Sequence, residues 1–200
     1  TGLKGGHSGM EIQQQRGNAI RLLARILRDA GDEIRIDKID GGNAHNAIPR
    51  EARAIITLPA AGVDTVRKVV AEQSVAIKEE LAVSDAGVTV TVSDVGATPA
   101  RVMTADSTTR VIRMLNALPH GVDAMSLDVP GLVETSSNLA AVKTEGDTVN
   151  VLISVRSSIG SSLIALRDRA QAAAELAGAS IEHNDPYPGW KPNLNSEVLS

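Results

Sequence analysis

The stretch TVNVLISVRSS at residues 148–158 has the two-residue period of a β-strand. Successive side chains of a strand point to opposite faces, so alternate residues share a face. One face is built from branched apolar side chains and the other is more polar: Val149, Val151, Ile153 and Val155 against Asn150, Leu152, Ser154 and Arg156. A strand that is apolar on one side only is typical of an antiparallel sheet covered on one face.

The segments around this strand extend the sheet and supply helices to cover it. In the second half, a helix is predicted at 107–117, strands at 121–126, 132–142 and 148–156, a long helix at 160–177 and a short strand at 179–183. In the first half, a helix is predicted at 10–30, strands at 34–39 and 52–58, a helix at 63–81 and a strand at 87–92. The expected fold class is α+β: a mainly antiparallel sheet with helices on one face, made of two ferredoxin-like halves (split βαβ units) at about 1–95 and 96–200.

Composition limits the classes of partner. A hydrophobic fraction of 42% without low-complexity runs indicates a chain that folds. The net charge of −4 is small and the basic residues are scattered, so nucleic acid is not an expected partner. No apolar run approaches the roughly 20 residues that a membrane helix needs, and zero cysteines exclude disulfides and thiolate ligands. We expect a cytoplasmic location, no membrane partner and, because the chain opens with Thr1, a fragment of a longer protein.

His7 is the first candidate site residue. It lies between glycines in GLKGGHSGMEI (2–12), and Ser8 with Glu11 has the spacing of a capping box that would start the helix at 10–30. A helix N-terminus disfavours a cationic imidazole, whereas a neutral one could donate a hydrogen bond to an oxyanion or carboxylate. The alternative is an ordinary surface histidine in a glycine-rich turn.

Asn46 and Arg156 are the other candidates. Asn46 belongs to the loop GGNAHNAIPR, whose amides could hold a ligand carbonyl or carboxylate, although asparagine also stabilises ordinary turns. Arg156 ends the strand at 148–156 on its more polar face, next to small serines. Its guanidinium could bind a carboxylate with two parallel hydrogen bonds, or it could be a solvated surface arginine.

Metal, nucleotide and nucleophile chemistry have no support in this sequence. The four histidines, at 7, 45, 120 and 183, have none of the spacings of metal-binding motifs. GxSxG, Walker-type and GxGxxG patterns are also absent from the sequence. We therefore expect no metal ligands in this chain.

Five separated stretches, in order, resemble the aminoacyl-histidine dipeptidases, a carnosinase-like family of di-zinc metallopeptidases that cleave Xaa-His dipeptides. The stretches are GLKGGHSG (2–9), GGNAHNAIPRE (41–51), GLVETSSNLAAV (131–142), ISVRSS (153–158) and YPGWKPNLNS (187–196). The resemblance is to the lid, or dimerisation, domain of that family and runs nearly from end to end of the chain. It implies that residues 1–200 are a lid domain without its catalytic domain, which would hold two zinc ions.

The resemblance also implies roles for the three candidates. His7 is similar to the lid histidine that reaches the partner subunit's active site and steadies the developing oxyanion. Asn46 is similar to the amide that helps to hold the substrate, and Arg156 to the clamp for the C-terminal carboxylate of the dipeptide. Asn138, in ETSSNL, is a second candidate for the substrate amide, but NAHNAIP around Asn46 is the better match.

The function expected from the resemblance is a substrate-clamping and dimerisation domain of a zinc-dependent hydrolase. Its expected partners are the dipeptide, its own catalytic domain and a second copy of the chain, and the isolated 200 residues are expected to be inactive. Two other readings stay open on the sequence: a stand-alone ferredoxin-like module that binds a small molecule, and a pure assembly element that pairs through an edge strand or helix.

Overall fold

The computed structural model describes residues 1–96, 99 and 101–184. The tail stretch YPGWKPNLNS and part of the boundary between the predicted halves lie outside these residues. The helices are α1 (Ala19–Asp29), α2 (Val63–Glu80), α3 (Ala105–Ala117) and α4 (Gly160–Leu176), with short 3-10 helices at Ile12–Gln14 and Ala60–Gly62. The strands are β1 (Gly6–His7), β2 (Arg35–Gly41), β3 (Ala47–Ile48), β4 (Ala52–Thr57), β5 (Gly121–Met125), β6 (Val133–Glu145) and β7 (Thr148–Ser157).

β6 is the longest strand and organises the main sheet. β7 pairs with it along one edge, while β5 and β2 pair with successive parts of the other edge, around Ser137 and Val142 respectively. β4 extends the sheet beyond β2, and every one of these pairings is antiparallel. Strands from both halves of the chain thus form one five-stranded antiparallel sheet, as the predicted fold class requires.

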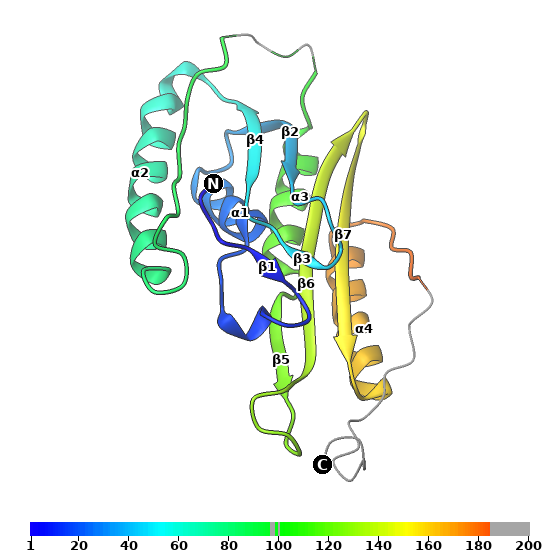
Figure 1. The fold of residues 1–200 in the computed structure, drawn as a ribbon. Helices are drawn as coiled ribbons and strands as arrows, with labels where there is room; N and C mark the ends of the chain where they lie inside the picture. The colour runs from blue at the N-terminus through cyan, green and yellow to red at the C-terminus, as the bar shows by residue number, and fades with distance from the viewer. Residues whose placement is uncertain (97–98, 100, 185–200) are drawn as a thin grey trace.

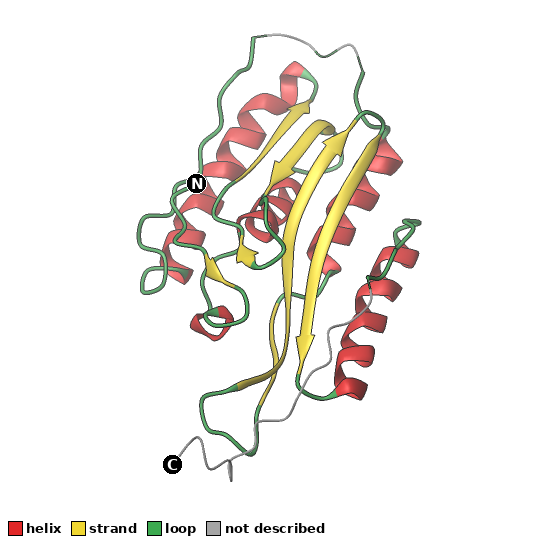
Figure 2. Ribbon diagram, turned by 45° about the vertical axis from the view of Figure 1, so that its right-hand side comes forward, coloured by secondary structure: helices red, strands yellow, loops and turns green. Residues whose placement is uncertain are grey.

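The four α-helices lie on one face of this sheet, which is seen from its other face in Figure 2. α1 and α3 lie next to each other over the sheet, with α2 beside α1 and α4 beside α3. The core between helices and sheet is aliphatic and includes the fully buried side chains of Ile20, Ile36, Leu115 and Leu139. The phase predicted for β7 is confirmed, because Val149, Val151 and Ile153 pack against this core.

The predicted strand at 87–92 does not form. Val88 is buried and Val90 packs against the core, so the alternation reflects burial on one side. The segment has no strand beside it, however: Thr89 exchanges its backbone hydrogen bonds with Thr1 alone, at 2.8 and 2.9 Å. A strand needs a run of backbone partners, and among the described residues only Thr1 pairs with this segment.

The predicted strand at 179–183 is also wrong. α4 ends at Leu176, and Gly178 follows it with a φ of +70°, which suits a glycine after a helix. The Ala179 amide donates back to the Ala174 carbonyl of the last turn. Residues 181–184 follow as irregular chain. Each half therefore has its strands framed by two helices but lacks the last strand of a complete split βαβ unit.

The helix predicted at 10–30 is two separate pieces. Gln15 adopts a left-handed conformation with φ of 53°, which ends the short helix at Ile12–Gln14. α1 then starts afresh, because the Asn18 side chain accepts hydrogen bonds from the amides of Ile20 and Arg21. α1 thus starts at Ala19, eleven residues after Ser8, and its N-cap is Asn18 instead of Ser8.

Candidate functional site

A small two-stranded ribbon, β1 with β3, lies on the sheet face that the helices leave open (Figure 1). Its register opposes His7 to Ala47, and the Ser8 amide continues the ribbon by donating to the Asn46 carbonyl at 2.8 Å. Asn138 of β6 fixes the ribbon to the sheet, because its side-chain NH₂ donates to the Ala47 carbonyl at 2.8 Å. The pairing brings the first stretch of the chain beside the loop that contains Asn46.

His7 is held through its backbone and through one ring nitrogen. Its amide donates to the Glu11 carboxylate at 2.7 Å. This hydrogen bond, together with the ion pair between Glu11 and Arg16, lowers the pKa of the Glu11 carboxyl. The Gly9 amide points at His7 Nδ1, 3.2 Å away, so Nδ1 accepts and the ring proton belongs on Nε2. Nε2 bonds to none of the described residues and is free to donate to a ligand.

The predicted capping box between Ser8 and Glu11 is wrong. The Ser8 hydroxyl is buried without a partner, and Glu11 accepts from the amide of His7, not from that of Ser8. His7 therefore does not stand at the N-terminus of an α-helix, and no helix dipole acts on it. The position of His7 is set by the pairing of β1 with β3 and by the hydrogen bond from its amide to the Glu11 carboxylate.

Arg156 reaches the same spot from the far end of the sequence. A Cβ built on Gly9 would lie 2.7 Å from Arg156 Nη1 and 3.1 Å from His7 Cε1, so guanidinium and imidazole flank one backbone position. Arg156 is exposed, on the face of β7 that turns away from the core. Within the described ranges its guanidinium has no carboxylate partner, which leaves the fork available to an anion.

The two asparagine candidates have different positions. The side chain of Asn46 is half-buried and, in the described part of the chain, makes no hydrogen bond. Asn138 is 1% exposed, and its NH₂ is taken by the carbonyls of the 45–47 loop. Asn138 thus positions the loop from beneath, whereas Asn46 lies at the surface of the ribbon.

Sequence reasoning missed Gly9 and the anchoring function of Asn138. Gly9 matters because a side chain there would come between His7 and Arg156, which are far apart in the sequence. No local pattern could have indicated it. The buried phase of β6 around Leu139 would have placed Asn138 on the opposite face, but not against Ala47.

Comparisons with known proteins found similar sequences and a similar structure. Residues 1–85 match the family model described as "Peptidase dimerisation domain". Residues 1–85 are thus similar to a peptidase dimerisation domain. Over 200 residues it is 38% identical to the cytosol non-specific dipeptidase of Escherichia coli strain K12, covering 99% of this chain and 41% of that protein. It also matches the crystal structure of aminoacylhistidine dipeptidase from Vibrio alginolyticus with a TM-score of 0.92 and 41% identity, over 100% of this chain and 41% of the other.

These relatives confirm the resemblance to dipeptidases and the mixed fold of the dimerisation domain. The chain spans about two fifths of the length of each relative and so corresponds to only part of each. In the ranges that the structure describes, no three His, Cys, Asp or Glu side chains gather closely enough to hold a metal ion. Among the same residues, no helix is both long and apolar enough to span a membrane.

Proposed function

We propose that this dimerisation domain is the substrate-clamping lid of a zinc-dependent, cytoplasmic dipeptidase that hydrolyses Xaa-His dipeptides of the carnosine type. The observation that supports this proposal best is the meeting of His7 and Arg156 on either side of Gly9. A neutral donor and an unpaired guanidinium at one exposed spot suit a ligand that has a carboxylate at one end and a peptide carbonyl near it.

Each residue has a role in this proposal. Arg156 binds the C-terminal carboxylate of the dipeptide with two parallel hydrogen bonds. Asn46 holds the substrate through its uncharged amide, at the surface of the ribbon. His7 donates from Nε2 to the carbonyl oxygen of the scissile bond, where negative charge develops as the bond is attacked. The Gly9 amide keeps Nδ1 as the acceptor and so fixes this tautomer.

The metal centre is proposed to lie outside this chain. The described residues do not offer a metal-ligand set, so the two zinc ions would be held by the catalytic part of the parent protein, where zinc activates water. The present chain would supply only substrate contacts and is expected to be inactive alone. An assay of the isolated 200 residues with zinc and a carnosine-like dipeptide tests this, and turnover above background would contradict it.

The proposed assembly is a homodimer in which His7 reaches the active site of the partner subunit. Because His7 and Arg156 are neighbours within one chain, both must serve the same active site. A His7→Ala subunit mixed with an Arg156→Ala subunit should then form heterodimers in which each clamp lacks one of its two residues. Activity per heterodimer no higher than that of the single-variant homodimers is expected, and recovery of about half the wild-type value would show that the clamp is divided between subunits.

Arg156→Ala in the full-length parent tests the clamp itself. Loss of a charge-assisted bidentate contact of about 1.5–3 kcal/mol predicts a KM raised roughly 10- to 100-fold, with a smaller change in kcat. Arg156→Lys should recover only part of this, since an ammonium lacks the planar fork. Arg113→Ala is the matched control, because Arg113 is also exposed and makes no side-chain contact with described residues. Wild-type KM in Arg156→Ala would show that Arg156 is not the clamp.

A further inference from the structure

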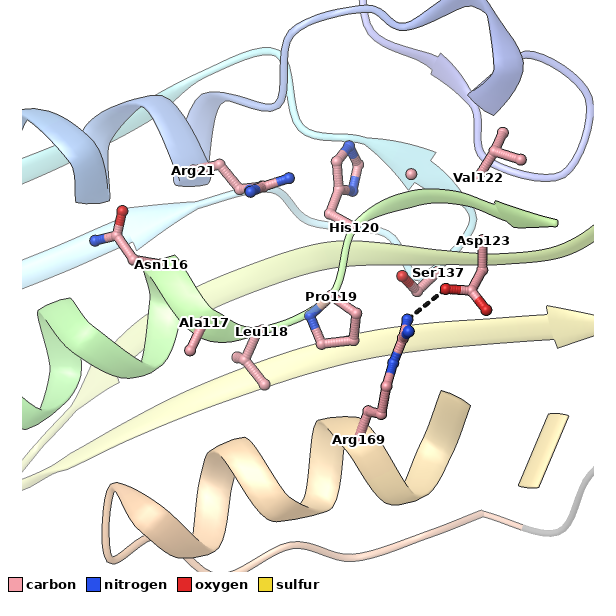
Figure 3. Close-up of a pocket in the computed structure, with 11 residues that line it drawn as sticks. Arg21, Asn116, Ala117, Leu118, Pro119, His120, Val122, Asp123, Ser137 and Arg169 are labelled. Carbon is pink, nitrogen blue, oxygen red and sulfur yellow. Dashed lines mark hydrogen bonds and ion pairs between the residues drawn. The ribbon is translucent and has the colours of Figure 1, made fainter. Parts of the chain in front are cut away.

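A second hollow lies on the helix-covered side of the sheet, behind the clamp. Its volume is about 330 Å³. It is bordered by helices α1 and α4, by strand β6 and by the turn between α3 and β5 (Figure 3). Arg21, His120, Ser137, Asp123 and Arg169 supply its polar lining. The clamp residues do not line it, so it is a separate site.

His120 is a half-buried polar group of this hollow. Its Nδ1 faces two donors, the Leu139 amide at 3.3 Å and the Asn18 side-chain amide at 3.2 Å. Two N–H groups can point at one nitrogen only if that nitrogen is unprotonated, which assigns the proton to Nε2. Burial, and then the charge of Arg21, lowers the pKa of His120 to about 4, so the ring stays neutral near pH 7. Nε2 has no acceptor among the described residues.

Arg21 supplies the charge of the hollow. Its guanidinium extends toward the imidazole of His120 (Figure 3) and, in the described part of the chain, pairs with no carboxylate. The other charged groups nearby are already paired. Arg169 pairs with Asp123 inside the hollow, and Arg16, which lines a smaller depression beside His120, pairs with Glu11. The Arg21 guanidinium and the His120 Nε2–H therefore line the cavity without an acceptor among the described residues.

We propose that this cavity binds a small oxyanion, a phosphate or a carboxylate, between the Arg21 guanidinium and Nε2–H of His120. Charge-assisted hydrogen bonds from guanidinium to oxyanion are the stronger kind, and a neutral imidazole adds a directional donor that does not change charge near pH 7. The Ser137 hydroxyl on the cavity wall can donate a third bond. The volume of about 330 Å³ admits an ion of this size together with water.

The test uses inorganic phosphate as the probe and the full-length parent protein. Calorimetric titration at constant ionic strength, set with chloride, should give a phosphate affinity that falls at least tenfold in Arg21→Gln. Arg21 is exposed and its side chain makes no hydrogen bond with described residues, so this variant should keep its fold. Arg113→Gln, on α3 outside the cavity, is the matched control and should bind phosphate as the wild type does.

A second measurement locates the ion and distinguishes the two kinds of oxyanion. The ¹⁵N-imidazole spectrum of His120 should show its Nε2–H signal moving downfield with phosphate in the wild type and staying fixed in Arg21→Gln. Acetate is then titrated alone: a matching shift assigns the site to carboxylates as well, and no shift restricts it to phosphate. Phosphate bound at a metal centre elsewhere in the parent would be insensitive to Arg21. Equal phosphate affinity in wild type and Arg21→Gln, or no response of His120, would overturn the proposal.

Discussion

Gly9→Ala is the sharpest test of the proposed clamp, because it adds one methyl group exactly between two proposed substrate contacts. The new Cβ would lie 2.7 Å from Arg156 Nη1 and 3.1 Å from His7 Cε1. Carbon and nitrogen atoms need about 3.5 Å, so the guanidinium must retreat by something like 1 Å. Misplacing a substrate-positioning group by about 1 Å can reduce turnover as much as 100-fold. We expect kcat/KM to fall by about 10- to 100-fold.

Stability should not fall with activity in this variant. Gly9 does not have a positive φ, so alanine fits its backbone, and the atom that it meets is the free end of an exposed side chain. Replacing glycine by alanine at such a position stabilises a chain by about 0.4–1 kcal/mol through the unfolded state. Gly160→Ala is the matched control, since nothing lies within 4 Å of its added Cβ and its φ is not positive either.

The assay compares steady-state hydrolysis of a carnosine-like dipeptide with thermal unfolding for the full-length parent and both variants. Wild-type kinetics are expected for Gly160→Ala, and a loss of kcat/KM without a loss of Tm for Gly9→Ala. A Gly9→Ala enzyme with kcat/KM within twofold of the wild type would refute the reasoning. It would mean that substrate does not meet His7 and Arg156 together.

Three further predictions concern stability. Asn138→Ala removes the side-chain amide that donates to the Ala47 carbonyl and should lower the free energy of unfolding, measured in urea, by about 1–3 kcal/mol. An unchanged urea midpoint of unfolding would mean that Asn138 does not hold the β1–β3 ribbon on the sheet. Gly42→Ala should lower the free energy of unfolding by more than about 1 kcal/mol, because φ at Gly42 is +67° and the added Cβ would collide with the Ala140 carbonyl oxygen. Gly146→Ala is the comparison: its φ of +58° is similar, but its Cβ would point into open space, so the free energy of unfolding should fall less. Burial lowers the pKa of His120 from 6.5 to about 4 in the folded chain, so the unfolded chain takes up its proton first. Stability should therefore decline by about 3 kcal/mol as pH falls from 6.5 to 4, and His120→Asn should flatten this slope in urea titrations between those pH values.

The regular elements could be predicted because their burial pattern is local. The helix at 63–81 and the strand at 148–156 differ from α2 and β7 by no more than a residue at either end. The segment 87–92 shows the limit of this reasoning: its alternation reports which side is buried, but not whether a strand lies beside it. The Ser8–Glu11 pattern failed for a related reason, because Asn18 starts the helix and Glu11 bonds to His7 instead.

The candidate site could be predicted residue by residue but not as an arrangement. Strand phase placed Arg156 on the open face, and the glycines around His7 indicated a close backbone approach. Their meeting at Gly9 depends on the path of β1 over β6, which no periodicity encodes. His120 had no distinguishing neighbours in sequence, since Asn18 and Leu139, which determine its tautomer, come from distant segments.

The length of β6 has a mechanical consequence. This one strand binds β5 near its start and β2 near its end, and the β1–β3 ribbon is fastened to its middle by Asn138. A bend near either end of β6 would break strand pairing on both edges, whereas residues 138–141 pair with β7 alone and include a register shift. The Asn138 side chain thus ties the ribbon to the stretch of β6 that the sheet itself restrains least.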